Sequence, residues 1–224
     1  MGIGSRSEIK KFLKTCRVKL NGKFEKSSNT QVDIDKDEIL FDDEIVIYKE
    51  FTYLMLNKPK DYISATFDPK LPTVLELLEF PYSNMELFPV GRLDIDTTGF
   101  LILTNDGKFS YNVTNPKKKV NKKYLVTLRD DISSNQIESL EKGIYFEKED
   151  FTTENAKVEE ISKREIYLTI SEGKFHQVKR MLEYVGNEVV ELKRVSIGNL
   201  SLDEKLELGE YREITNTELE EIFK

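Results

Sequence analysis

Apolar residues recur along this chain with two different spacings. Residues 165–171 (EIYLTIS) place an apolar side chain at every second position, which is the pattern of a half-buried strand. The same pattern of short apolar runs predicts strands at 53–57, 100–104, 123–128 and 189–192. Helices are predicted at 72–78, 133–143 and 175–185. This mixture of strands and helices indicates an α+β fold.

The predicted helix at 175–185 carries a lysine, Lys179, at the border of its apolar face. At about 100° per residue, Phe175, Val178 and Leu182 share one apolar face. Lys179 lies at the edge of that face, whereas Arg180 points more nearly to solvent. Such a lysine either extends its charge to water along the apolar surface or, if desolvated, needs a carboxylate partner.

The first 48 residues read as a small separate module. Ser7 is predicted to cap a helix over 8–15, in which Ile9, Phe12 and Leu13 form the apolar stripe. The opposite side of that helix carries Lys10, Lys11 and Lys14. A strand at 18–20 with a tight turn at Asn21-Gly22, and a further strand at 44–48, complete the module. The predicted domains are therefore 1–48 and 50–224.

Composition limits the class of protein. A hydrophobic content of 38% in 224 residues is that of a globular chain. No apolar run approaches the roughly 18 residues of a membrane helix, and the N-terminus lacks the apolar segment of a secretory signal. Cys16 and His176 are the only residues of their kinds, which excludes a disulfide framework and a Cys/His zinc site. We therefore expect the protein to work in the reducing cytoplasm and to have no membrane partner.

The net charge of −7 conceals a strong sorting of charge along the chain. Residues 8–26 hold seven Lys/Arg against two acids, and residues 117–129 hold six against none. Residues 27–50 and 203–224 each hold eight acids. Two basic patches on an acidic body can bind RNA, because the local patch governs phosphate contact. The alternative for each patch is a solvated face.

The segment 91–107 (GRLDIDTTGFLILTNDG) is the most informative part of the sequence. It places Asp94 on a short loop before a buried strand, and 105–107 ends that strand. A calcium loop starting at Asp94 would need an acid at its twelfth position, where Asn105 stands. A D-x-D-x-T phosphatase nucleophile should follow an apolar strand, but here the strand comes afterwards. An isolated loop of this kind would be a solvated turn.

The loop is not isolated, because further motifs surround it. Residues 53–59 (YLMLNKP) precede it, and 122–127 (KKYLVT), 172–181 (EGKFHQVKRM) and 209–212 (GEYR) follow. In this order and spacing the blocks resemble the pseudouridine synthases that modify ribosomal RNA at single sites, over nearly all of 50–221. The form of 174–181 looks most like the small-subunit enzymes. The resemblance implies a mixed, largely antiparallel sheet with flanking helices, and isomerisation of uridine to pseudouridine without cofactor or metal.

The resemblance also implies roles for individual residues. Asp94 matches the catalytic aspartate, which either attacks the sugar as a nucleophile or removes a sugar proton. Lys179 matches its basic partner, with Arg180 as the substitute. Tyr124 matches the tyrosine that stacks on the target uracil, although an ordinary strand tyrosine is the alternative. The expected RNA contacts are Arg92, Lys58, Arg180 and His176.

The N-terminal pattern, SRSE at 5–8 and RVKLNG at 17–22, resembles the RNA-binding module of ribosomal protein S-four without its usual first helix. This resemblance implies RNA contacts by Lys10, Lys11, Lys14 and Arg17. We expect a monomer whose partner is ribosomal RNA or a ribosomal assembly intermediate. The alternatives are a large-subunit pseudouridine synthase, a non-catalytic RNA-binding assembly protein, and a phosphatase using Asp94 and Asp96.

Overall fold

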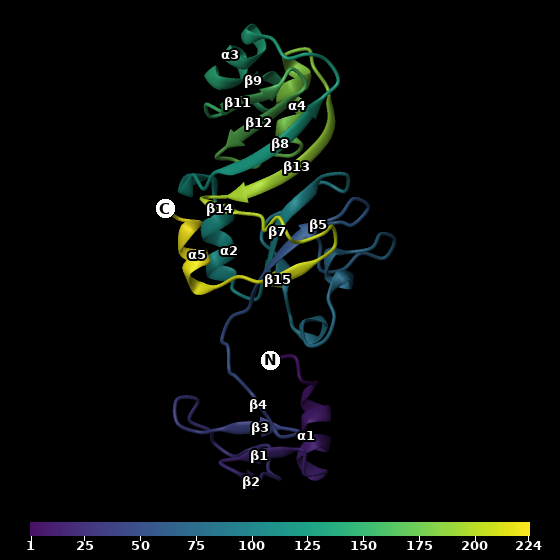
Figure 1. The fold of residues 1–224 in the computed structure, drawn as a ribbon, viewed down its shortest axis with the longest axis vertical. Coiled ribbons are helices and arrows are strands. Elements are labelled where there is room, and N and C mark those ends of the chain that lie inside the picture. Colours follow the sequence, from purple (N-terminus) through teal and green to yellow (C-terminus); the bar gives the residue numbers. More distant parts are fainter.

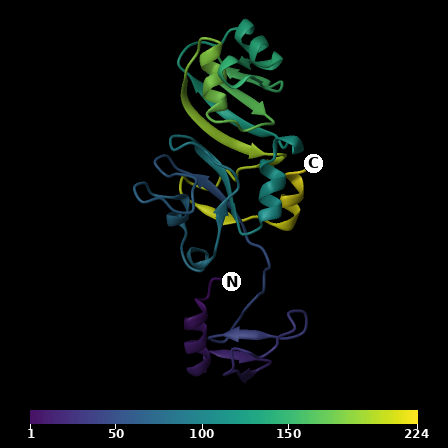
Figure 2. The same cartoon turned by 180° about the vertical axis from the view of Figure 1, so that it is seen from behind.

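The computed structural model describes residues 1–147 and 149–224. Figures 1 and 2 show an N-terminal module at one end of the long axis and two lobes of a larger domain beyond it. The two lobes share one sheet of nine strands, and the module has its own sheet of four. The fold class predicted from the sequence is confirmed.

The N-terminal module packs one helix beside its sheet. Helix α1 (Arg6–Lys14) is followed by β1 (Val18–Leu20), β2 (Lys23–Phe24), β3 (Ile39–Phe41) and β4 (Glu44–Ile45), in the sheet order β2-β1-β3-β4. The predicted cap, Ser7, is wrong. Ser5 caps the helix, because Glu8 lies three residues after it and the two complete a capping box. Asn21 and Gly22 both have positive φ, which suits the predicted tight turn between β1 and β2.

The large sheet is antiparallel except at one seam. Its order is β11-β12-β8-β13-β7-β5-β15, and β7 and β13 form its parallel pair. The strands along this path are β5 (Tyr53–Lys58), β7 (Thr98–Thr104), β8 (Lys122–Leu128), β11 (Lys157–Ser162), β12 (Glu165–Ile170), β13 (Val189–Ile197) and β15 (Tyr211–Glu213). The short strands β6 (Phe88–Pro89) and β14 (Leu200–Ser201) pair with β7 and β13, while β9 (Tyr145–Phe146) and β10 (Phe151–Thr152) pair with each other.

Helices flank the large sheet. They are α2 (Gly107–Thr114), α3 (Ser134–Lys142), α4 (Gln177–Tyr184) and α5 (Asn216–Glu221), with 3-10 turns at Val74–Leu77, Tyr82–Asn84, Pro116–Lys118 and Glu147–Glu149. The capping box of α3 and its end at Gly143 are as predicted. The predicted helix at 72–78 is only a 3-10 turn. Helix α2 was not predicted, because Asp106 does more than end a strand: its side chain accepts the Phe109 N–H at 3.0 Å and starts the helix.

The start of α4 differs from the prediction. His176 has a φ of 50°, so the helix begins only at Gln177, and Phe175 is 75% exposed rather than part of an apolar face. The side chain of Gln177 fixes this start. Its Nε2 donates to Glu172 Oε2 at 2.5 Å, and its Oε1 accepts the Lys174 backbone N–H at 3.0 Å. The buried face of α4 instead includes Val178, Met181 and Leu182.

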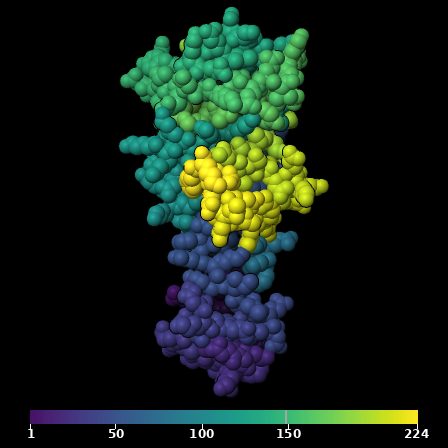
Figure 3. Space-filling model, turned by 60° about the vertical axis from the view of Figure 1, so that its left-hand side comes forward, coloured from purple at the N-terminus to yellow at the C-terminus, as the bar shows by residue number. Residues whose placement is uncertain are grey.

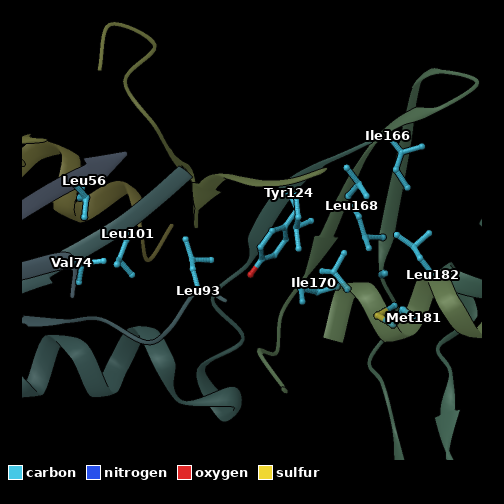
Figure 4. Packing of buried hydrophobic residues seen from close by; sticks show 14 of the residues in the cluster. Leu56, Val74, Leu93, Leu101, Tyr124, Ile166, Leu168, Ile170, Met181 and Leu182 are labelled. Atoms are coloured by element: carbon cyan, nitrogen blue, oxygen red, sulfur yellow. The ribbon is translucent and has the colours of Figure 1, made fainter. Parts of the chain in front are cut away.

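A continuous apolar core joins the two lobes. Figure 4 shows Leu56 and Leu101 from one lobe at one end of this cluster and Leu168, Met181 and Leu182 from the other lobe at its far end, with Leu93, Tyr124 and Ile170 between them. The middle of the core therefore lies beside the seam between β7 and β13. Within the described residues, no helix is both long and apolar enough to cross a membrane.

Candidate active site

The loop that carries Asp94 is anchored just before β7. The Ser64 hydroxyl accepts the Leu93 N–H at 3.0 Å and donates to the Leu93 carbonyl at 3.1 Å. The Thr97 N–H donates to the Asp94 carbonyl at 3.1 Å and closes a turn. Gly99 then allows β7 to approach β13, because a Cβ there would lie 2.3 Å from the Arg194 carbonyl oxygen. The backbone around Asp94 is therefore fixed on both sides.

Lys58 lies underneath this loop and is fully buried. Its ammonium donates to the carbonyl oxygens of Pro59 at 2.9 Å, Asp94 at 3.1 Å, Ile95 at 3.3 Å and Thr97 at 3.0 Å. Burial lowers the pKa of Lys58 to about 8, although the nearby aspartates oppose this. The expected contact of Lys58 with RNA is corrected: the side chain has no exposed surface and holds the Asp94 loop from inside.

The structure brings Lys179 to Asp94 and keeps Arg180 away. Lys179 Nζ lies 3.4 Å from Asp94 Oδ2. Arg180 instead donates to Glu149 Oε1 at 2.7 Å and lies over the Phe146 ring, 4.2 Å from its centroid. The choice of Lys179 over Arg180 as the neighbour of Asp94 thus agrees with the geometry.

Asp96 is a second, closer partner of Lys179 that the sequence reasoning did not assign. Its two carboxylate oxygens accept from Lys179 Nζ at 2.6 and 2.8 Å. Burial raises the pKa of Asp96, but the hydrogen bonds and charge of Lys179 outweigh burial and leave this pKa below its ordinary value. The Lys179 ammonium therefore contacts both acids. The spacing of two residues between Asp94 and Asp96 was the sequence feature that could have indicated a shared partner.

A pocket opens beside the Asp94 carboxylate. Polar side chains of Arg92, Asp94, Lys174 and His176 line it, together with Tyr124 and apolar residues from both lobes. Tyr124 comes from β8, is 8% exposed and turns its oxygen toward the gap between Leu93 and Ile170, as Figure 4 shows. Tyr124 and Asp94 therefore line the same pocket from different segments of the chain.

His176 and Arg92 lie at the rim of this pocket. His176 Nε2 is 3.6 Å from Asp94 Oδ1, beyond a hydrogen bond, and its ring stacks on Phe175 with centroids 3.8 Å apart. Its backbone is left-handed and immediately precedes α4. Arg92 is exposed on the same loop as Asp94. Both positions suit contact with a bound RNA.

The basic N-terminal residues divide into two kinds. Lys10, Lys11 and Lys14 are exposed on α1. Arg17 pairs with Asp42 and lies over the Phe12 and Phe41 rings, so its guanidinium holds the module together as well as facing solvent. In the 117–129 stretch, Lys122 is buried and Lys123 is half-buried beside Glu159. The exposed positions are 117–119 and Arg129, and of these Lys119 pairs with Glu154 and Arg129 with Asp130 and Glu188.

No group of three His, Cys, Asp or Glu side chains suited to a metal ion occurs in the part of the chain that the structure describes. The site thus combines a carboxylate beside an ammonium with a tyrosine at the wall of the same pocket, and the large mixed sheet supports both.

The chain belongs to the RNA pseudouridylate synthase family, whose sequence model matches residues 52–184. It is 48% identical to an uncharacterized RNA pseudouridine synthase of Bacillus subtilis, over 97% of this chain and 92% of that one. It is 42% identical to the ribosomal small subunit pseudouridine synthase A of Haemophilus influenzae, over 98% of this chain and 94% of that one. A crystal structure of a pseudouridylate synthase superposes with a TM-score of 0.73 at 41% identity, over 97% of this chain and 94% of that one.

Proposed function

We propose that this chain isomerises one uridine of small-subunit ribosomal RNA to pseudouridine, with Asp94 as the catalytic group. The observation that carries the proposal is the Asp94 carboxylate, which lies 3.4 Å from Lys179 in a pocket that Tyr124 also lines. The small-subunit target rests on relatives from Haemophilus influenzae, Yersinia pestis and Escherichia coli that carry that name.

The reaction explains why the pocket needs an anion. The bond between the uracil nitrogen and the ribose breaks, the uracil turns, and the ring carbon joins the same ribose carbon while its hydrogen leaves as a proton. A carboxylate promotes this either by attacking the ribose carbon or by removing a sugar proton. In both routes the carboxylate must be ionised to act.

The base must leave its RNA stack to reach Asp94. An extruded base is held by stacking on an aromatic side chain, and Tyr124 offers such a surface at the pocket wall. Arg92 and His176 at the rim are the proposed contacts to the flanking phosphates, and Arg180 is a weaker candidate because Glu149 already engages it.

The proposed division of labour assigns RNA binding to the module at 1–48 and chemistry to 50–224. The exposed Lys10, Lys11 and Lys14 of α1 give the module its basic face, in keeping with an S-four-like RNA-binding element. Changing all three to alanine should weaken RNA binding most at low salt and leave turnover at saturating RNA unchanged. Slower single-turnover catalysis at saturation would contradict this division. We further propose that the enzyme is a monomer and works in the cytoplasm.

The test of function uses RNA transcripts that carry tritium at the ring carbon of uridine, since forming the new carbon–carbon bond there releases the label. The purified chain should release tritium from small-subunit RNA or its assembly intermediate and not from large-subunit RNA. Release from large-subunit RNA alone would overturn the proposed target. RNA binding without release from any of these substrates would favour a non-catalytic assembly protein.

A further inference from the structure

The basic segment after α2 meets the C-terminal helix and builds a cavity away from the catalytic pocket. Figure 3 turns this side forward and shows the teal residues around α2 beside the yellow C-terminal residues. The cavity has a volume of about 440 Å³, within the range of small-ligand sites. Its polar lining consists of lysines and asparagines: Lys118, Lys119, Lys224, Asn112, Asn121 and Asn199.

The chemistry of this lining is that of a nucleotide site. Three ammonium groups suit phosphate, and no Asp or Glu is among the described residues that line the cavity. The side-chain amides of Asn112, Asn121 and Asn199 make no hydrogen bond to another described residue, so each keeps a donor and an acceptor for the edge of a base.

Phe223 adds an aromatic surface to the same cavity. Its ring is 51% exposed and is held on its inner side by Phe109, with ring centroids 5.8 Å apart in an edge-to-face arrangement. A ring that is anchored on one side and open on the other is the usual stacking platform for an unpaired base. An apolar metabolite would not need the lysines, and a phosphate alone would not need the ring.

The lysines are free to exchange their partners. Lys119 pairs with Glu154 and Lys224 with Glu221, but all four side chains are well exposed. Exposed pairs of this kind contribute about 0–1 kcal/mol, so phosphate can replace the carboxylates at little cost.

The cavity and the catalytic pocket are built against the same two strands. Asn121 and Gly198, beside the ends of β8 and β13, line the cavity, whereas Tyr124 of β8 and Leu192 of β13 line the pocket. The segment before Asp94 also touches the end of α2, because Gly91 packs on the Thr114 methyl group.

We propose that this cavity binds an unpaired nucleotide of the substrate RNA that flanks the target uridine. The inference rests on the proposed function for the identity of the RNA, and on the cavity alone for the site. It assigns a use to Lys118 and Lys119, which lie outside the catalytic pocket.

The test compares two variants with the same charge change. Lys118→Gln/Lys119→Gln/Lys224→Gln removes the three cavity lysines. The control, Lys142→Gln/Lys157→Gln/Lys163→Gln, removes three exposed lysines of α3, β11 and the turn after it.

Binding of a small-subunit RNA transcript is measured against KCl concentration for the full-length chain. The cavity variant should bind about tenfold more weakly at low salt, with a log–log salt slope smaller by about 2, since each lost phosphate contact removes about 0.7. Equal weakening in both variants, or none in either, would overturn the proposal.

A third variant separates stacking from charge. Phe223→Leu keeps an apolar side chain against Phe109 but removes the ring, so it should weaken binding about fivefold with an unchanged salt slope. Unaltered affinity of Phe223→Leu would refute the stacking surface. Turnover at saturating RNA should be unchanged in all variants. If the wild-type chain binds the transcript but forms no pseudouridine, the proposed function fails while the comparison of binding still decides the site.

Discussion

Replacing Lys58 with methionine tests whether the catalytic loop is held by its buried ammonium. Methionine nearly preserves the volume of the side chain but cannot donate to the carbonyls of Asp94, Ile95 and Thr97. We expect a large loss of activity with a small change in the free energy of unfolding, because two opposing effects on stability nearly cancel.

The magnitudes follow from the surroundings of Lys58. Burial lowers its pKa from 10.5 to about 8, so keeping the buried amine charged costs roughly 3 kcal/mol at about 1.4 kcal/mol per pKa unit. Methionine removes that cost but also removes hydrogen bonds to buried carbonyls, each worth about 1 kcal/mol. The net change in stability at pH 7 should therefore be within about 2 kcal/mol. The loss of activity should be about 100-fold or more, because a shift of about 1 Å at a catalytic group has that effect.

The free energy of unfolding should also depend on pH in a direction set by the lowered pKa of Lys58. The folded-state pKa of Lys58 lies below its unfolded value, so the unfolded chain binds more protons between about pH 8 and 10.5. The cost of the buried charge is complete below pH 8 and is lost as the pH rises through this window. Wild type should therefore gain stability relative to Lys58→Met between pH 8 and 10.5.

The assays are urea unfolding at pH 7 and pH 10 and single-turnover tritium release at pH 7. Lys60→Met is the matched control, because the Lys60 side chain is half exposed and its ion pair with Glu191 is long, at 3.5 Å. Lys60→Met should be close to wild type in activity. Wild-type activity in Lys58→Met, or complete unfolding of that variant at pH 7, would refute the reasoning.

Three further predictions concern the residues of the pocket and their neighbours. Asp94→Asn should reduce tritium release by several orders of magnitude with RNA binding intact, and Asp96→Asn should cost far less; activity of Asp94→Asn within about tenfold of wild type would exclude Asp94 as the catalytic group. Tyr124→Ala should weaken binding by roughly 1–3 kcal/mol, while Tyr124→Phe should bind normally and turn over slowly only if the hydroxyl moves a proton; equal wild-type kinetics for both would leave Tyr124 a plain strand residue. Lys179→Met should lose more activity in steady-state assays than Arg180→Met, because Lys179 faces Asp94 and Arg180 is engaged by Glu149; the opposite order would reverse the pairing.

Much of the fold could be predicted from local patterns. Alternating apolar residues identified β12, and the capping box identified α3, because both signals lie within a few consecutive residues. Helix α2 was missed because Asn105-Asp106-Gly107 is also a turn sequence, and only the tertiary position of Asp106 shows that it caps a helix. The start of α4 was misplaced because Phe175 fits the helical period, whereas the Gln177–Glu172 hydrogen bond decides where the helix begins.

The candidate site was only partly predictable, because it too depends on contacts between residues far apart in the sequence. The edge position of Lys179 was visible in the sequence, whereas its pairing with Asp94 came from the resemblance to pseudouridine synthases. The burial of Lys58 was not visible, because a lysine beside proline at the end of a strand is ordinarily exposed. Its four carbonyl partners come from two separate segments that only the folded loop brings together.

The most direct test of the account maps pseudouridines in ribosomal RNA from cells that have the chain, lack it, or carry only Asp94→Asn. Chemical derivatisation followed by primer extension reveals each modified position. The account predicts one small-subunit position that is modified in the first cells and unmodified in the other two. An identical map in all three, or restoration of that position by Asp94→Asn, would contradict it.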